Sequence, residues 1–155
     1  MTAIPSPPGG AFDGPLHRLA LRAYYEDTDT GGVVYHANYL RWYERARTDM
    51  LRLLDIRLSD TIAEDVGTYV VAECTLKFTG SARLDDVVMI ESRVTEARRA
   101  SVFMEQRALV DDSEINRATL RLGFVTMDGK PRRQPDGWLE AFRSVMAEEP
   151  EQELQ

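Results

Sequence analysis

The clearest pattern of hydrophobic and polar positions lies in residues 38–55, where apolar side chains return every three or four positions. This spacing is the repeat of an α-helix with one buried face. We predict a long helix capped by Asn38, whose side chain can accept a hydrogen bond from a free N–H of the first turn. The stripe expected to be buried consists of Tyr39, Tyr43, Ala46, Met50 and Leu53, widened by Leu40 and Leu54.

From Gly67 onward the hydrophobic repeat changes to two, which is typical of β-strands. In the stretch ECTLKF, apolar and polar residues alternate, so Cys74, Leu76 and Phe78 point to one face of the strand and the polar residues to the other. We therefore predict that Cys74 is a buried structural thiol. Three further β-type stretches follow, separated by short charged turns, and another strand precedes the helix from Leu16. A short C-terminal helix is predicted over the stretch GWLEAFRSVM.

These elements together predict an α+β fold. Strands joined by tight turns pair antiparallel, and the long helix can cover one face of their sheet. We expect an antiparallel sheet wrapped around that helix in a single domain over residues 16–147. Residues 1–15 hold four prolines and several glycines, so we expect a disordered N-terminal segment. Residues 148–155 form an acidic C-terminal tail.

Composition narrows the possible functions. The chain has 155 residues and a net charge of −7, so we expect no binding to nucleic acid. One cysteine allows no intrachain disulfide, which fits a reducing compartment. The N-terminus has no basic start followed by an apolar run, and no stretch reaches the roughly 20 apolar residues of a membrane span. We therefore expect a cytoplasmic protein without a membrane span.

The stretch DTDTGGVVYHANY, just before the helix, concentrates the candidate chemistry. Asp and Gly are frequent in ordinary turns, which is the plainest interpretation. A calcium loop is not supported, because its fifth and twelfth positions would be Gly31 and Asn38 rather than a set ending in Glu. A zinc site lacks enough nearby ligands. We expect neither a metal nor a cofactor.

The longer stretch YEDTDTGGVVYHANYLRWYERARTDMLR resembles the signature of the hot-dog-fold acyl-CoA thioesterases. It is most similar to the 4-hydroxybenzoyl-CoA thioesterase type and to the thioesterase associated with the Tol–Pal system. The resemblance is strongest over residues 22–54 and extends more loosely to residue 128. It implies a hot-dog fold and the hydrolysis of an acyl-CoA thioester to a free acid and coenzyme A.

The resemblance also implies roles for residues of this stretch. The family's catalytic aspartate corresponds to Asp29, acting as nucleophile or general base. Its carbonyl-polarising backbone N–H corresponds to His36, whose imidazole either assists the reaction or simply packs at the helix start. Gly32 would allow close backbone approach. Tyr35 would line the acyl pocket or pack in the core, and Asp27 would support the turn.

A second candidate site is the turn that holds Arg98, Arg99 and Ser101. A solvated charged turn is the plain interpretation. In the resembling family, the matching turn contacts the phosphates of coenzyme A, and guanidinium groups suit phosphate. One relative has a lysine where this chain has Ala100, which weakens the expected phosphate clamp.

The resemblance finally implies a homo-oligomer, a dimer or a tetramer, because a lone unit leaves a sheet edge exposed. Acyl-CoA is the expected substrate partner, and acyl carrier protein is a possible one. The alternative function is a non-catalytic acyl-CoA or acyl-carrier-protein binding module associated with an envelope complex. Asp29 separates the two, since a pure binding module does not require it.

Overall fold

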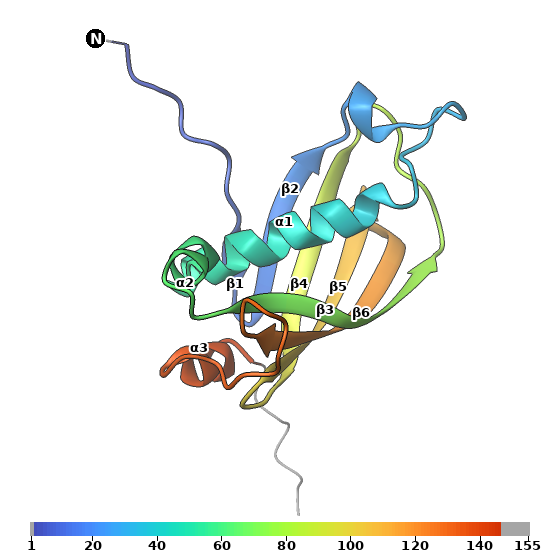
Figure 1. Ribbon diagram of the computed structural model, residues 1–155. Helices are drawn as coiled ribbons and strands as arrows, with labels where there is room; N and C mark the ends of the chain where they lie inside the picture. Colours follow the sequence, from blue (N-terminus) through green and yellow to red (C-terminus); the bar gives the residue numbers. More distant parts are fainter. Residues whose placement is uncertain (1, 147–155) are drawn as a thin grey trace, which may run out of the picture.

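The computed structural model describes residues 2–146 and contains one antiparallel sheet of six strands in the order β1-β2-β4-β5-β6-β3 (Figure 1). The sheet curves around one long helix, α1 (Asn38–Leu53), which confirms the predicted α+β fold. The predicted acidic tail lies outside the described residues. The strands are β1 (Ala11–Asp13), β2 (Leu16–Arg22), β3 (Thr68–Phe78), β4 (Val87–Ala97), β5 (Ser101–Val110) and β6 (Ser113–Val125). The shorter helices are η1 (Tyr25–Asp27), α2 (Leu58–Ala63) and α3 (Trp138–Ser144).

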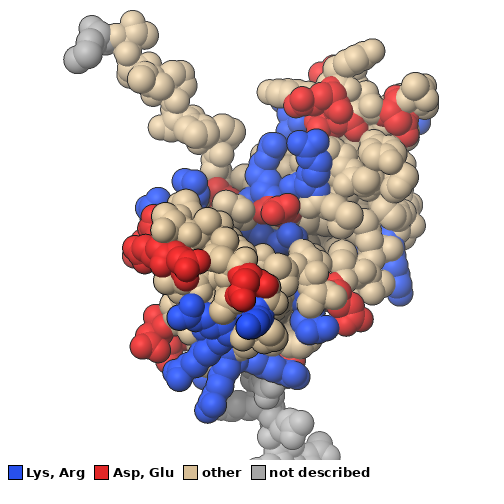
Figure 2. Space-filling view, viewed as in Figure 1, with Lys and Arg blue, Asp and Glu red and all other residues tan. Residues whose placement is uncertain are grey.

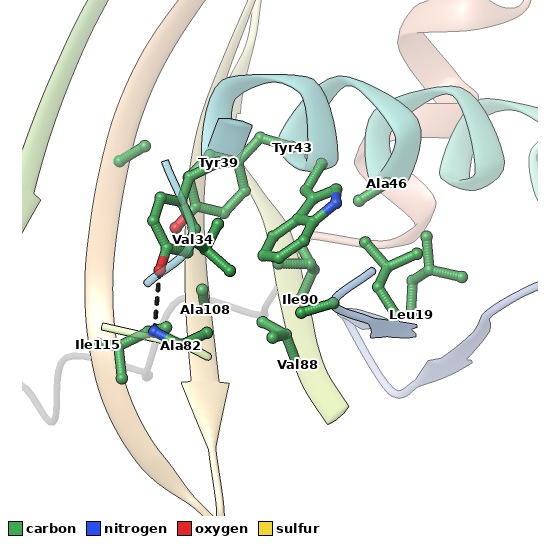
Figure 3. Close-up of a cluster of buried hydrophobic side chains, with 14 of the residues drawn as sticks. Leu19, Val34, Tyr39, Tyr43, Ala46, Ala82, Val88, Ile90, Ala108 and Ile115 are labelled. Carbon is green, nitrogen blue, oxygen red and sulfur yellow. Dashed lines mark hydrogen bonds between the residues drawn. The ribbon is translucent and has the colours of Figure 1, made fainter. Parts of the chain in front are cut away.

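Two aromatic residues of α1 anchor the helix to the core (Figure 3). Tyr39 and Tyr43 are fully buried among apolar side chains of β2, β4, β5 and β6. The Tyr39 hydroxyl accepts a hydrogen bond of 3.0 Å from the backbone N–H of Ala82, in the connection between β3 and β4. Tyr43 donates its hydroxyl hydrogen to the side chain of Asn116 in β6. The helix is therefore fixed over the sheet by polar contacts as well as by apolar packing.

The buried side of α1 differs from the predicted stripe. Leu40 is 44% exposed and Leu53 is 50% exposed, whereas Trp42 and Leu51 are buried. The predicted cap is also wrong: the N-cap is Ala37, and Asn38 is a buried residue of the first turn. The physical reason is that α1 packs on β2 and β4 rather than centrally on the sheet, which turns a neighbouring side of the helix inward.

The expected disorder of residues 1–15 is wrong for β1. This strand pairs antiparallel with β2, with Phe12 opposite His17. The preceding residue, Gly10, donates its backbone N–H to the carboxylate of Asp49 on α1 at 3.0 Å. Asp49 also lies 2.7 Å from Nε2 of the buried His17. Pairing with β2 and the hydrogen bond to Asp49 satisfy backbone groups of residues 10–13. These contacts order a segment whose Pro/Gly-rich composition predicted disorder.

Strand β3 has one neighbour, β6, and its other edge is free among residues 2–146. The side chains that face the helix layer are poorly covered, because α1 lies over β2 and β4. The prediction of a buried Cys74 is therefore wrong, since this thiol is exposed. Val71 and Phe78 are likewise about half exposed. A long strand with unpaired backbone groups and exposed apolar residues is a ready site for pairing with another strand.

We predict that Tyr39→Phe lowers the free energy of unfolding by roughly 1–3 kcal/mol, because it leaves the buried N–H of Ala82 without an acceptor. Urea denaturation at one fixed protein concentration measures this change. Tyr25→Phe is the matched control, because Tyr25 is 83% exposed. Equal stability of the two variants would show that the Tyr39 hydroxyl contributes nothing to the anchoring of α1.

Candidate active site

The loop before α1, which holds the predicted catalytic Asp29, folds as a small hairpin. The backbone N–H of Tyr35 donates to the carbonyl oxygen of Asp27 at 2.9 Å, and that of Asp29 donates to Val33 at 2.9 Å. Gly32, at the tip, has a φ of +81°, a left-handed conformation that favours glycine. The hairpin ends at Tyr35, directly before the start of α1.

Asp29 lies at the exposed tip of this hairpin. Its carboxylate accepts the backbone N–H of Gly31 at 2.8 Å, which is an ordinary turn contact. Among residues 2–146, the Asp29 side chain makes no hydrogen bond to the first turn of α1. Asp29 lies two residues beyond Asp27, or about 7 Å along an extended strand, and it is Asp27 that contacts the first turn of α1 through Asn38.

The N-terminus of α1 has no side-chain cap. Asn38 instead donates its side-chain N–H to the Asp27 carboxylate at 3.1 Å, and Asp27 also accepts the backbone N–H of Tyr24 at 2.8 Å. Asp27 therefore supports the hairpin. Backbone N–H groups at an uncapped helix start favour a negatively charged oxygen.

Aromatic rings surround the start of α1. The exposed imidazole of His36 lies 4.5 Å from the ring of Tyr35, measured between ring centroids. The centroid of Phe78, at the end of β3, is 6.4 Å from that of His36. Sequence reasoning did not assign Phe78 to the site, because 42 positions separate the two residues along the chain. The free edge of β3 thus reaches the helix start.

Arg98, Arg99 and Ser101 lie in the turn between β4 and β5. Arg98 pairs with Glu96 at 2.7 Å, whereas Arg99 has no ion pair within the described chain. Gln134 ties this turn to the segment after β6 by hydrogen bonds to the carbonyl oxygens of both arginines. The turn thereby joins a second exposed basic pair, Arg132 and Arg133, which sequence reasoning missed although the two arginines are adjacent in the sequence.

This basic patch (Arg98, Arg99, Arg132 and Arg133) lies far from the hairpin of the same chain. Figure 2 shows blue side chains gathered at the lower end of the molecule, and Figure 1 shows the loop before α1 at the upper end. Strand β4 runs between the two regions, and its eleven residues span about 33 Å. One chain therefore does not bring its own hairpin and its own basic patch together. We call these two regions the half-sites.

A cavity of about 720 Å³ lies away from both the hairpin and the basic patch. It is bordered by β2, by the outer side of α1 and by residues 7–9. Within residues 2–146, no cluster of three or more His, Cys, Asp or Glu side chains could hold a metal ion. No helix of this part of the chain is long and apolar enough to cross a membrane.

Comparisons with known proteins identify the family and support the fold. Residues 31–115 match the sequence profile of the Thioesterase superfamily. The acyl-CoA thioester hydrolase YbgC of Escherichia coli O6:H1 is 39% identical over 130 residues, which cover 83% of this chain and 96% of that protein. A probable thioesterase from Bartonella henselae is 33% identical, with a TM-score of 0.73 and coverage of 77% and 99%. The 4-hydroxybenzoyl-CoA thioesterase of Pseudomonas sp. strain CBS-3 has a TM-score of 0.73 at 23% identity, covering 81% and 98%, and shares the fold.

We predict that Gly32→Ala lowers the free energy of unfolding by about 1–2 kcal/mol, because a Cβ strains the left-handed conformation at this position. No atom lies within 4 Å of the added carbon, so the effect isolates backbone strain. Urea denaturation measures it. Gly123→Ala is the control, since Gly123 lacks a positive φ and its Cβ would meet only an ordinary contact at 3.9 Å. An unchanged free energy of unfolding in Gly32→Ala would contradict the left-handed conformation at the hairpin tip.

Proposed function

Because this chain belongs to the Thioesterase superfamily, we propose that it is an acyl-CoA thioesterase that hydrolyses the thioester to a free acid and coenzyme A. The observation that supports the proposal is the hairpin of residues 27–35, which leads into the uncapped start of α1 and carries the exposed Asp29 two residues after Asp27, the carboxylate bound to Asn38. The YbgC relative, named as an acyl-CoA thioester hydrolase, supports the same activity. The exposed Cys74 thiol is compatible with a reducing cytoplasm, where we place the reaction.

The chemistry requires two groups at one carbonyl. The backbone N–H of His36, at the positive end of α1, polarises the thioester oxygen and stabilises the negative charge that develops on it. One such donor typically contributes about 10² to 10³ in rate. Asp29 attacks the carbonyl carbon as a nucleophile, or removes a proton from the attacking water as a general base. In both cases water supplies the new oxygen of the acid, and the sulfur leaves as the thiol of coenzyme A.

We further propose that the chain acts as a homo-oligomer built on the free edge of β3. Antiparallel pairing of two β3 strands places Phe78 of one chain near Thr68 of its partner. The partner's β5 then lies three strand spacings away, or about 14 Å, and begins at the turn with the basic patch. A dimer thus joins the hairpin of one chain to the arginines of the other. Dimer and tetramer are both compatible with this pairing.

The basic patch is the proposed site for the phosphates of coenzyme A. The chain carries a net charge of −7, so anions need a local concentration of positive charge. Arg99 is exposed and free of ion pairs within the described chain, and its guanidinium offers paired donors to a phosphate oxygen. The same patch suits the acidic surface of an acyl carrier protein as a second source of thioester. Ser101 is half-buried at the start of β5, and its carbonyl closes the turn by accepting the N–H of Arg98 at 2.8 Å.

We predict that Asp29→Asn lowers kcat by at least about 100-fold, because an amide neither attacks the carbonyl nor accepts a proton from water. Release of free thiol from a panel of acyl-CoAs measures turnover. The matched control is Asp13→Asn, an exposed aspartate of β1. Full activity of Asp29→Asn would favour the alternative of a binding module, for which Asp29 has no task.

We predict that the double variant Arg98→Ala with Arg99→Ala raises KM roughly tenfold or more and changes kcat less, because phosphate binding is remote from the reacting carbon. Steady-state kinetics with one acyl-CoA measure both constants. The control is Arg52→Ala with Arg57→Ala, which removes two exposed arginines on α1 and before α2. An equal rise of KM in the control would mean that the arginines attract coenzyme A only by their general charge and that the turn is not a specific phosphate site.

Mixing the Asp29→Asn variant with the Arg98/Arg99 double variant tests whether the site spans two chains. After exchange of subunits, a chain with Asp29→Asn and a chain with the Arg98/Arg99 substitutions form one site that has both intact residues. Activity at low substrate concentration should rise above that of either variant alone. No rise after verified exchange would place both half-sites in one chain.

A further inference from the structure

Arg47, on α1, is a partly buried cation that has no carboxylate oxygen within 4.0 Å among residues 2–146, although burial lowers its pKa and the charge of Glu44, one turn earlier on α1, raises that pKa again from a longer distance. Four arginines of the described chain are partly buried, and three of them form ion pairs within 4.0 Å. Arg47 forms none. Burial of an unpaired charge is costly, and burial lowers the pKa of the Arg47 guanidinium without neutralising it at physiological pH. The three paired arginines are Arg107, Arg117 and Arg121, all on the outer face of the sheet.

The position of Arg47 is fixed by a buried amide. Its Nη1 donates to Oε1 of Gln106 at 3.0 Å. Both hydrogens of the Gln106 amide are already used, one by the carbonyl of Tyr43 at 3.0 Å and one by Oγ of Ser92 at 2.9 Å. Oε1 can therefore only accept, and Gln106 is fully buried. Gln106 holds the guanidinium in place and leaves most of its five donors for another group.

Arg47 belongs to the side of α1 that faces β3. Leu40 and Arg47 lie two turns apart on one side of the helix, as the 3.6-residue repeat requires. The charge of Arg47 is felt at Cys74, whose thiol pKa is raised by burial and partly lowered again by the guanidinium. We name these two helix residues and the inward-facing Val71, Cys74 and Phe78 of β3 the uncovered face. Its apolar members are 44–49% exposed.

The uncovered face leads from the proposed reaction centre to Arg47. At one end, Phe78 lies beside His36 at the helix start. Along α1, the ten residue steps from Ala37 to Arg47 span about 15 Å. Helical side chains lean toward the N-terminus, so the distance from the helix start to the Arg47 guanidinium is shorter than this. Along β3, the four residues from Phe78 back to Cys74 span about 13 Å. The path is apolar and ends in a cation.

We propose that Arg47 binds a carboxylate at the far end of the acyl group, so that the substrates are medium-chain acyl-CoAs with a terminal carboxylate. This rests on the proposed function. A methylene chain matches the apolar path, and a carboxylate matches the guanidinium, whose parallel donors bind both oxygens at once. Arg47 is thus a specificity-determining residue that takes no part in the hydrolysis. The competing occupant is a carboxylate from a second copy of the chain.

The test compares suberoyl-CoA with octanoyl-CoA, which differ only by the terminal carboxylate. Wild-type protein should show a kcat/KM ratio for suberoyl-CoA over octanoyl-CoA of about tenfold or more, as expected for hydrogen bonds to a charged group. Arg47→Gln should bring that ratio down at least tenfold, and Arg47→Lys should restore part of it. Arg45→Gln, an exposed arginine on the other side of α1, is the control and should keep the ratio.

Calorimetric binding of suberate and octanoate gives a readout that needs no turnover. Suberate should bind the wild type more tightly than octanoate, and Arg47→Gln should remove the difference. The proposal is overturned if Arg47→Gln changes neither the kcat/KM ratio of the two acyl-CoAs nor the binding of suberate. The same result is expected if a carboxylate of a second copy of the chain already binds the Arg47 guanidinium. Arg47-dependent suberate binding without hydrolysis of either acyl-CoA would uphold the anion site and remove the hydrolase assignment. Hydrolysis of both acyl-CoAs at equal kcat/KM would uphold the hydrolase assignment and remove the carboxylate site at Arg47.

Discussion

The organisation of this molecule depends on the off-centre packing of one helix on a six-stranded sheet. The Tyr39 hydroxyl accepts the N–H of Ala82 and the Tyr43 hydroxyl donates to Asn116 in β6, while the backbone of α1 lies nearest to β2 and β4. A single helix in that position leaves apolar side chains of β3 exposed, and β3 is also the last strand of the sheet formed by residues 2–146, so its outer edge is free. The uncovered face and the proposed assembly edge therefore meet on the same strand.

The start of α1 shows how a helix terminus can be stabilised and still remain available to a ligand. A side chain at the N-cap position would satisfy one of the free backbone N–H groups and compete with a carbonyl oxygen. Here Ala37 occupies that position, and the stabilising contact is displaced to Asn38, whose amide binds Asp27. The hairpin is secured by Asp27, which leaves the neighbouring Asp29 free of any structural task except its turn contact with Gly31. One carboxylate fixes the loop and the other is available for chemistry.

The sequence predicted the element types well because hydrophobic repeats report local geometry directly. The helix over residues 38–53 and the strands after Gly67 follow from repeats of 3.6 and two. The errors at Leu40, Leu53 and Cys74 share one cause, since a repeat identifies the apolar face of an element but not the neighbour that covers it. The order at β1 depends on Asp49, whose contact with Gly10 joins residues far apart in the chain. Arg132 and Arg133 could be linked to the Arg98 turn only through the fold, by Gln134.

The two half-sites argue for assembly more strongly than the exposed edge alone. Within one chain, β4 separates the proposed catalytic hairpin from the basic patch by about 33 Å, whereas the proposed pairing across β3 would reduce the lateral separation to about 14 Å. Antiparallel pairing is the symmetric choice for two identical edges, because a two-fold axis relates them and reverses their direction. In the proposed dimer, such an axis would generate two equivalent sites, each drawn from both chains. The same pairing would bring a second chain toward the uncovered face and reduce its access to water, which would strengthen the attraction between Arg47 and any carboxylate that reaches it.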